Sequence, residues 1–276
     1  MFLSKSSFTN KLCFKAKQFK QPISTNLRSP SKPFLVSQTD QNLLNYCIKQ
    51  SSPQPEYLQA IYNKTFDTLP NAHNMISPLQ GILLSMLVSL FKPTTTLELG
   101  CYVGYSALCI AHGLNNSLLN NGAHIWTCEV NENIAKVAEE NIQNSNYKNN
   151  ITILKKSAMQ VLQEWDSNKK IDFAFIDANK SGYLDYFNVI LERNLLHQDG
   201  FIIADNTCFR AQVHQLDPTC SDLPIKQVQN NSNTTKNNSK VALHIYNFNN
   251  FVSNHPKVEQ LLLPIFDGFT IIKLKN

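Results

Sequence analysis

The sequence predicts an α/β fold in which a mostly parallel β-sheet is covered by helices on both faces. Five short apolar segments follow one another along the chain, and helical runs separate them. Such alternation is typical of parallel strands that are joined by crossover helices. The apolar segments do not alternate with polar residues, which indicates strands buried on both faces. Two closing strand-like runs joined by Asp267-Gly268 predict an antiparallel edge.

The elements are expected in a regular order, beginning with a buried helix over 81–91. The strand–helix units that follow are 95–99 with 106–112, 124–129 with 133–144, 151–154 with a helix through Trp165, 171–177 with 183–196, and 201–205 with 241–254. The closing runs cover 258–265 and 269–274. The chain has no internal repeat.

Length and composition limit the class of protein. The chain has 276 residues, of which 42% are hydrophobic and 16% charged, so it can bury a full core. No apolar run approaches the roughly 20 residues that cross a bilayer, and we expect no membrane span. The seven cysteines are scattered without a C-x-x-C pair, which disfavours a disulfide framework or zinc site and favours a reducing compartment.

The net charge of +5 is concentrated at the N-terminus. Residues 1–39 carry seven basic and no acidic side chains, whereas the remaining 237 residues carry 18 basic and 20 acidic ones. The body of the chain therefore lacks the basic stripe that phosphate-backbone binding requires, and no nucleic-acid partner is expected.

Composition also divides the chain. We expect residues 1–39 to be an appendage and 40–276 to form the fold, with a polar, Asn-rich surface loop at 227–240. The appendage is basic and Ser-containing, with apolar residues at helical spacing, and this fits a mitochondrial presequence. It fits the solvated tail of a cytoplasmic protein equally well, so both localisations stay open.

The ends of the predicted strands are the place to look for chemistry, because ligands of such sheets bind beyond the carboxyl ends where the strand order reverses. The first strand runs into Gly100 and Gly104, which permit a tight turn and a close approach to a ligand. The pattern is not G-x-G-x-x-G, which disfavours a dinucleotide. Glu129 ends the second strand, where a carboxylate can accept from both ribose hydroxyls.

Three oxygen-bearing side chains end the fourth and fifth strands. They are Asp177, Asp205 and Asn206. Any one of them could simply cap a turn. Two carboxylates and an amide at one edge of the sheet suit a hard divalent cation such as magnesium or calcium, and their convergence favours a metal site.

Six segments carry motifs in a consistent order within 56–275. They are Met75–Gly81, Glu98–Ser106, Cys128–Asn131, Phe175–Lys180, Ala204–Asn206 and Leu263–Gly268. Together they closely resemble the cation-dependent O-methyltransferases, a family that includes caffeoyl-CoA O-methyltransferase and, more distantly, catechol O-methyltransferase. The resemblance implies a Rossmann-like S-adenosylmethionine-dependent methyltransferase fold with a seven-stranded sheet.

The resemblance also implies the residues that bind the methyl donor, S-adenosylmethionine. They are Met75 and Ser77 over the donor, Glu98, Gly100 and Tyr102 around its methionine part, Ser106 near its carboxylate, Glu129 at the ribose, Ala158 at the adenine, and Asp177. The implied metal ligands are Asp177, Asp205 and Asn206, with Mg²⁺ as the first choice and Ca²⁺ or Mn²⁺ as alternatives.

The implied catalytic residues are Lys180, as the base, and Asp177. A catechol hydroxyl is a poor nucleophile at neutral pH, and a divalent cation would stabilise its ionised form and hold it against the methyl sulfonium. Lys180 can take the proton if the cation and desolvation lower its own pKa. The resemblance further implies a small phenolic acceptor and a homodimer.

The sequence departs from the family pattern in the acceptor region. The stretch 207–211 reads Thr-Cys-Phe-Arg-Ala where the family usually has Leu-Trp-x-Gly, and Asn179 stands where a second acid is common. A coenzyme A thioester, a flavonoid and a small catechol therefore all stay open as acceptors. Two other functions also stay open: an NAD-dependent oxidoreductase, and a catalytically silent methyltransferase-fold protein that binds partners.

We expect removal of residues 1–39 to leave stability and turnover essentially unchanged. Seven like charges without an acid provide no internal pairing, and the few apolar residues cannot offset the entropy of ordering the segment. Thermal unfolding and steady-state kinetics of the truncated and full-length chains test this. Tenfold slower methylation by the truncated chain would place the segment in the working enzyme.

Overall fold

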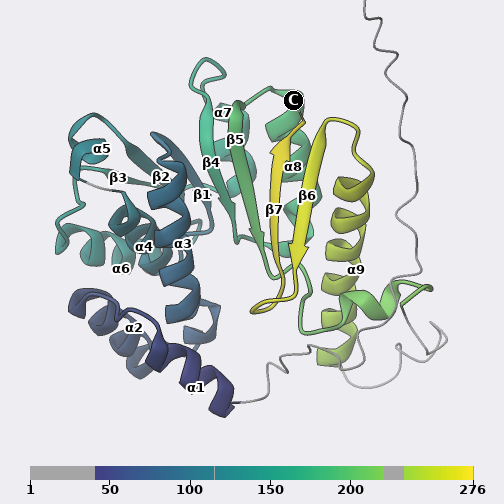
Figure 1. The fold of residues 1–276 in the computed structure, drawn as a ribbon, viewed down its shortest axis with the longest axis horizontal. Coiled ribbons are helices and arrows are strands. Elements are labelled where there is room, and N and C mark those ends of the chain that lie inside the picture. The colour runs from purple at the N-terminus through teal and green to yellow at the C-terminus, as the bar shows by residue number, and fades with distance from the viewer. Residues whose placement is uncertain (1–40, 115, 221–232, 276) are drawn as a thin grey trace, which may run out of the picture. The chain divides into compact units, whose positions relative to one another are not determined.

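The computed structural model describes residues 41–114, 116–220 and 233–275. Its centre is a seven-stranded sheet of order β3-β2-β1-β4-β5-β7-β6 (Figure 1). The strands are β1 Thr95–Leu99, β2 His124–Cys128, β3 Ile151–Leu154, β4 Ile171–Ile176, β5 Leu196–Asp205, β6 Val258–Leu263 and β7 Phe269–Leu274. Neighbours from β3 to β5 pair in parallel, and β7 pairs antiparallel with both β5 and β6. The predicted sheet class and antiparallel edge are confirmed.

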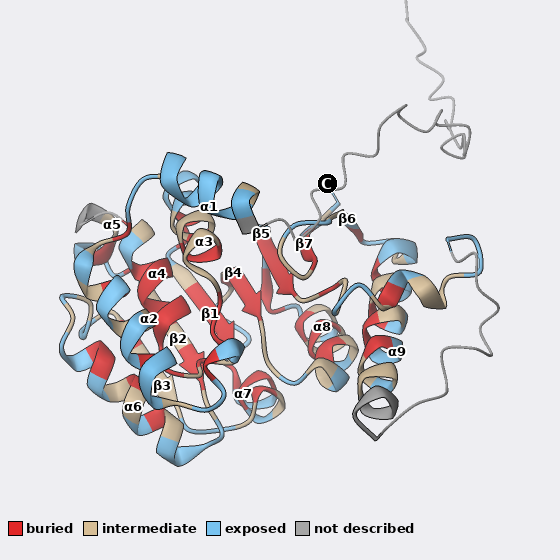
Figure 2. Cartoon of the chain, turned by 90° about the horizontal axis from the view of Figure 1, so that it is seen from below, coloured by how far each residue is buried: buried red, intermediate tan, exposed pale blue. Residues whose placement is uncertain are grey.

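Helices cover both faces of this sheet. The helices are α1 Gln41–Gln50, α2 Glu56–Thr68, α3 Pro78–Phe91, α4 Tyr105–Gly113, α5 Asn116–Asn120, α6 Glu132–Gln143, α7 Ala158–Glu164, α8 Tyr183–Glu192 and α9 Asn233–Asn254. Short 3₁₀ turns lie at Ala72–Asn74, Lys180–Gly182 and Val213–Leu216. One core cluster packs α7, α8 and α9 against the sheet, and the other packs α2, α3, α4 and α6. Figure 2 shows the central strands almost wholly buried between these layers.

The predicted helix over 183–196 and the strand over 201–205 need correction. The helix ends at Glu192, and Asn194 then adopts a left-handed φ of 52°, which breaks the helix. The strand β5 already begins at Leu196. The pairing of β5 with β4 is shifted in register, and the polar residues 197–199 are exposed. Because these residues interrupt the apolar pattern, the first part of the strand was not predicted.

The predicted loop over 227–240 is wrong from Asn233 onward, because α9 begins there, while residues 227–232 lie outside the described part of the chain. Ala242, Ile245, Phe248 and Val252 are buried along one face of this helix. Helix formation is cooperative, so a helix anchored by such a face can extend through polar residues. The expected appendage at 1–39 also lies outside the described residues, and its boundary stays a prediction.

Residues 72–91 are, by length and composition alone, able to cross a membrane, although they combine a 3₁₀ turn, an extended link and the helix α3. One such segment is weak evidence for a span, so it does not contradict the expectation that the chain has no membrane span. The segment includes α3, which packs on α4 and buries Leu84 and Val88 in the core. The part of the chain that the structure describes thus contains no clear membrane span.

The loop after β1 passes against the end of β4, and this contact positions the site. The Asp177 N–H donates to the Leu99 carbonyl at 2.9 Å, which continues the β1–β4 ladder beyond the strands. Gly100 follows with a φ of 106°, and a Cβ added there would lie 2.4 Å from the Asp177 carbonyl oxygen. Only glycine permits both this backbone conformation and this approach.

We expect Gly100→Ala to lower the free energy of unfolding by roughly 2–4 kcal/mol, because it combines a left-handed backbone with a clash against backbone atoms. The matched control is Gly122→Ala. Gly122 has a φ of 92° but nothing within 4 Å of an added Cβ, so its cost should be only about 1–2 kcal/mol. Urea unfolding of both variants measures the difference, and equal losses would show that the Asp177 contact is unimportant.

Candidate functional site

The sheet topology brings the predicted strand-end residues to one edge. The strands β2, β1, β4 and β5 are parallel neighbours, so their carboxyl ends point the same way. Glu129 follows β2, Asp177 follows β4, and Asp205 ends β5. The charges of Glu129 and Asp177 both act on the buried Glu98 carboxyl of β1, so these groups form one electrostatic cluster.

Glu98 is the most deeply buried acid of this cluster. Its side chain has no exposure to solvent, and one oxygen, Oε2, accepts from the Thr127 hydroxyl. The other oxygen, Oε1, has no hydrogen-bond partner among the described residues. Burial raises the pKa of Glu98 to about 8, although the hydroxyls of Ser106 and Thr127 act in the opposite direction. A buried acceptor without a partner suits a cationic ligand group.

Glu129 joins the loops that follow β1 and β2. Its Oε2 accepts from the Tyr102 N–H at 3.0 Å, and its Oε1 accepts from the Asn131 N–H at 2.8 Å. Tyr102 has a left-handed φ of 47°, and Glu129 is partly exposed. The carboxylate is thus fixed in orientation and accessible to a ligand.

The remaining predicted donor residues lie at helix starts. Ser77 is the N-cap of α3 and Met75 is buried just before it. Ser106 is buried in the first turn of α4, and Ala158 is the first residue of α7, also buried. Helix N-termini present unpaired N–H groups and a positive dipole end, which favour carboxylates and polar acceptors.

Asp177 and Lys180 form an ion pair directly after β4. The Lys180 Nζ lies 2.7 Å from the Asp177 Oδ1, and the side chains are only 20% and 13% exposed. The 3₁₀ turn that begins at Lys180 brings the ammonium back over the carboxylate, and Asn179 caps this turn through its side chain. The predicted base and the predicted metal ligand are therefore in direct contact.

Asp205 is almost fully buried, at 2% exposure. Its Oδ1 accepts from the Asn206 N–H at 2.8 Å, and the side-chain amide of Gln80 donates to both of its oxygens, at 3.2 and 3.0 Å. Burial and the nearby Asp177 charge raise the pKa of Asp205 to about 7. The two carboxylates are thus close enough to repel each other.

Two residues of this cluster were not predicted as site residues. Gln80 contacts Asp205, and Asp267, in the turn between β6 and β7, accepts from the side chain of Asn206. Burial raises the pKa of Asp267. The sequence signal for Gln80 was its place three residues after Ser77, the pattern of a capping box. The signal for Asp267 was the antiparallel edge, which places the turn beside the end of β5.

Only the chemical nature of the three predicted ligands supports the expected metal site. Among the described residues, no three side chains of His, Cys, Asp or Glu converge as a metal cluster. The predicted set holds two carboxylates and an amide, whose side chain donates to Asp267. Hard oxygen donors of this kind fit magnesium, calcium or manganese and disfavour zinc.

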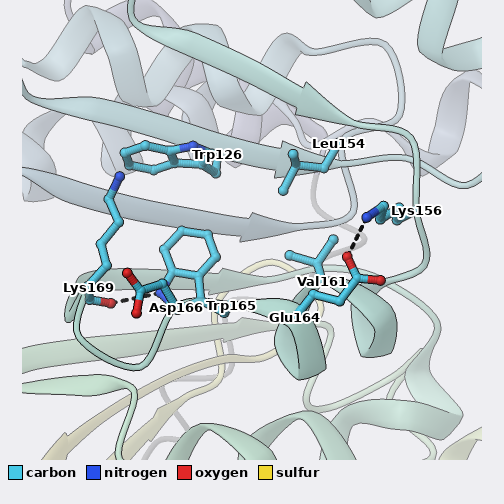
Figure 3. Close-up of a pocket in the computed structure, with 8 residues that line it drawn as sticks. All are labelled: Trp126, Leu154, Lys156, Val161, Glu164, Trp165, Asp166 and Lys169. Carbon is cyan, nitrogen blue, oxygen red and sulfur yellow. Dashed lines mark hydrogen bonds and ion pairs between the residues drawn. The ribbon is translucent and has the colours of Figure 1, made fainter.

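A cavity of about 250 Å³ lies beside α7 (Figure 3). It is lined by Trp126, Leu154, Lys156, Val161, Glu164, Trp165, Asp166 and Lys169. The Lys169 ammonium lies 3.4 Å from the Trp126 ring centroid, and Lys156 pairs with Glu164. These charged groups are engaged within the lining, and none of the predicted site residues lines it.

Comparison with known proteins defines the class. Residues 48–275 match the O-methyltransferase family, and the chain belongs to it. It is 29% identical over 235 residues to O-methyltransferase ankF of Aspergillus thermomutatus, covering 84% of this chain and 92% of that protein. It is 25% identical over 224 residues to caffeoyl-CoA O-methyltransferase of Stellaria longipes, covering 80% and 84%.

The solved structures agree with this assignment. The SAH-bound methyltransferase PaMTH1 of Podospora anserina superimposes with a TM-score of 0.77 at 28% identity, covering 90% of this chain and 100% of that one. The chain is therefore a class I O-methyltransferase with a Rossmann-like fold, and its methyl donor is S-adenosylmethionine. The oxidoreductase and the catalytically silent alternatives are set aside.

The buried carboxyl of Glu98 predicts a pH-dependent stability. Its pKa is about 8 in the folded chain and 4.5 ordinarily, so between these values the folded chain keeps a proton that the unfolded chain loses. Stability therefore falls as pH rises through this range. We expect the Glu98→Gln variant to be more stable than the wild type at pH 8, with a free energy of unfolding about 1–3 kcal/mol higher. Near pH 4.5 the two proteins should differ little in stability.

Urea unfolding of the ligand-free protein at pH 5, 6.5 and 8 measures this difference. Glu192→Gln is the control, because Glu192 is exposed at the end of α8. A stability difference between wild type and Glu98→Gln that does not grow with pH would contradict the assignment.

Proposed function

We propose that this O-methyltransferase transfers the methyl group of S-adenosylmethionine to one hydroxyl of a catechol-type acceptor, such as caffeoyl-CoA or a related phenolic, with the help of a divalent cation. The observation that carries the proposal is the buried Asp205 carboxylate beside Asp177, with a pKa raised to about 7. Asp177 and Asp205 are both largely buried, and among the described residues Lys180 forms an ion pair only with Asp177. The remaining negative charge is one that a divalent cation would balance.

The donor half of the proposal rests on Glu98 and Glu129. The unpaired Glu98 Oε1 is a buried acceptor that fits the ammonium of the donor's methionine part. Glu129 is held by two backbone N–H groups and can accept from the ribose hydroxyls. Gly100 and Tyr102 belong to the loop after β1, whose Tyr102 N–H donates to Glu129. Ser106, at the start of α4, would contact the donor carboxylate.

The roles of Met75, Ser77 and Ala158 follow from their positions at the starts of α3 and α7. Met75 and Ser77 would cover the donor, and the backbone at Ala158 would face the adenine. The SAH-bound relative supports donor binding by this fold, whereas each residue's role is part of the proposal.

The cation would be held by Asp177, Asp205 and Asn206. When bound, it would lower the pKa of the acceptor hydroxyl and fix its orientation. Asp177 also contacts Lys180, so the lysine nitrogen lies beside a carboxylate that would hold the cation. Lys180 would act as the base in its neutral form: its ammonium would first release a proton to solvent, and Nζ would then accept the proton of the acceptor hydroxyl.

The acceptor class is suggested by a relative and by the loop after Asn206. The Stellaria longipes relative is named for caffeoyl-CoA, a phenolic thioester. In this chain Phe209 provides an aromatic wall beside Arg210, whose guanidinium carbon lies 5.5 Å from the Phe209 ring centroid. An aromatic and cationic surface fits an acidic phenolic acceptor.

Assembly and location belong to the same proposal. Met86, Leu90 and Phe91 expose apolar surface along α3, which would suit the homodimer that the family resemblance implies. A cytoplasmic or mitochondrial location follows only from the composition of residues 1–39, and a fluorescent fusion of that segment would decide between them.

The cation requirement is tested by activity in EDTA. Methylation of a catechol should stop in EDTA and return with Mg²⁺, and Asp205→Asn should lose activity by about 100-fold or more because the amide lacks the negative charge that holds the cation. Asp185→Asn, an exposed acid on α8, should retain activity and serves as the control.

The acceptor requirement is tested with the same assay. A catechol should be methylated, and the matching phenol with one hydroxyl should not, because two adjacent oxygens are needed to hold the cation. Full activity of exhaustively dialysed enzyme in EDTA would reject the cation role and leave a cation-independent O-methyltransferase.

A further inference from the structure

Gln80 makes two sets of contacts that meet in one buried side chain. The Gln80 Oε1 accepts from the Ser77 N–H at 2.9 Å, and the backbone N–H of Gln80 donates to the Ser77 hydroxyl at 3.3 Å. Its Nε2 donates to both oxygens of Asp205, which lies 125 residues further along the chain. The side chain is 8% exposed. One amide thus links the start of α3 to the end of β5.

Capping of the helix does not explain the second set of contacts. The helix α7 begins with the same reciprocal arrangement, in which Gln160 accepts from the Ser157 N–H at 3.1 Å. Gln160 is exposed, and its hydrogen bonds are confined to the cap. The chain therefore contains a plain capping glutamine and a buried one that is turned onto a carboxylate.

The Asp205 carboxylate depends on Gln80 for its orientation. The Asn206 N–H donates to Oδ1 only, whereas Oδ2 accepts from the Gln80 side chain. A carboxylate held at one oxygen can rotate about its Cβ–Cγ bond, and donation to both oxygens fixes its plane. Partners of this kind orient metal ligands and tune their affinity.

The amide is chemically suited to this task because it donates without bringing a charge. A lysine at position 80 would neutralise Asp205 and compete with a cation, and a glutamate would repel the carboxylate. Gln80 leaves the negative charge of Asp205 intact while it satisfies part of its hydrogen-bonding capacity.

We propose that Gln80 is a positioning residue, which holds the Asp205 carboxylate in the orientation that binds the divalent cation. This inference rests on the proposed function, because it assigns the cation to Asp205. It predicts that loss of the Gln80 amide weakens cation binding even where the helix and the fold persist.

The experiment is a calorimetric titration of Mn²⁺ into EDTA-treated and dialysed full-length protein. Three proteins are compared: the wild type, Gln80→Met and Gln160→Met. Methionine matches glutamine in length and cannot make these side-chain hydrogen bonds. Each variant therefore loses the side-chain half of its capping box, and only Gln80→Met also loses the contact with Asp205. Affinity for S-adenosylhomocysteine and thermal unfolding, both measured in EDTA, verify the fold.

We expect Gln80→Met to bind Mn²⁺ about 10- to 100-fold more weakly than the wild type, and Gln160→Met to match the wild type. If Gln80→Met does not fold, Gln80→Asn makes the same comparison, because its shorter amide cannot reach both Ser77 and Asp205.

Equal Mn²⁺ affinities of wild type and the position-80 variant would overturn the positioning role and leave the proposed function intact. An equal loss in Gln160→Met would also overturn it, since capping alone would then explain the effect. A wild type that binds no Mn²⁺ would reject the cation in the proposed function, and the role of Gln80 with it.

Discussion

The site depends on the hydrogen-bond ladder between β1 and β4, which continues beyond both strands through the bond from the Asp177 N–H to the Leu99 carbonyl. This is the point where the strand order reverses, so loops from neighbouring strands leave in different directions and open a place for a ligand. Gly100 lets the first loop pass the Asp177 backbone without a side chain in between. The residues proposed to bind the donor and the acidic residues after β4 and β5 are therefore brought together by backbone geometry.

Two buried carboxyl groups lie at this edge of the sheet. Glu98 and Asp205 both have raised pKa values because burial disfavours their charged forms. Such groups destabilise a protein without ligands, and they gain favourable interactions when a cationic partner arrives. The arrangement exchanges stability of the free chain for affinity toward an ammonium group and, in our proposal, a divalent cation.

The sheet and the strand-end residues could be predicted because they depend on local signals. Apolar segments, helical spacing and residues such as Asp177 at segment ends are visible in one dimension. The contacts of Gln80 and Asp267 could not be predicted in this way, since each joins segments that only the strand order brings together. The first half of β5 was hidden for a different reason, because its polar residues 197–199 interrupt the apolar pattern.

The loop over 207–211, which we propose borders the acceptor, is fixed by the same turn that holds the proposed cation ligand Asn206. Phe209, Arg210 and Ala211 all have left-handed φ values, a costly run for residues with side chains. The Asp267 side chain accepts from the Arg210 N–H at 2.5 Å and from the side chain of Asn206, so one carboxylate supports both the loop and the ligand. Gly268 allows the close backbone approach, because an added Cβ would lie 2.1 Å from the Cys208 nitrogen. Side chains of this loop can therefore change with the acceptor, whereas its backbone N–H groups must stay in place if Asn206 is to keep its orientation.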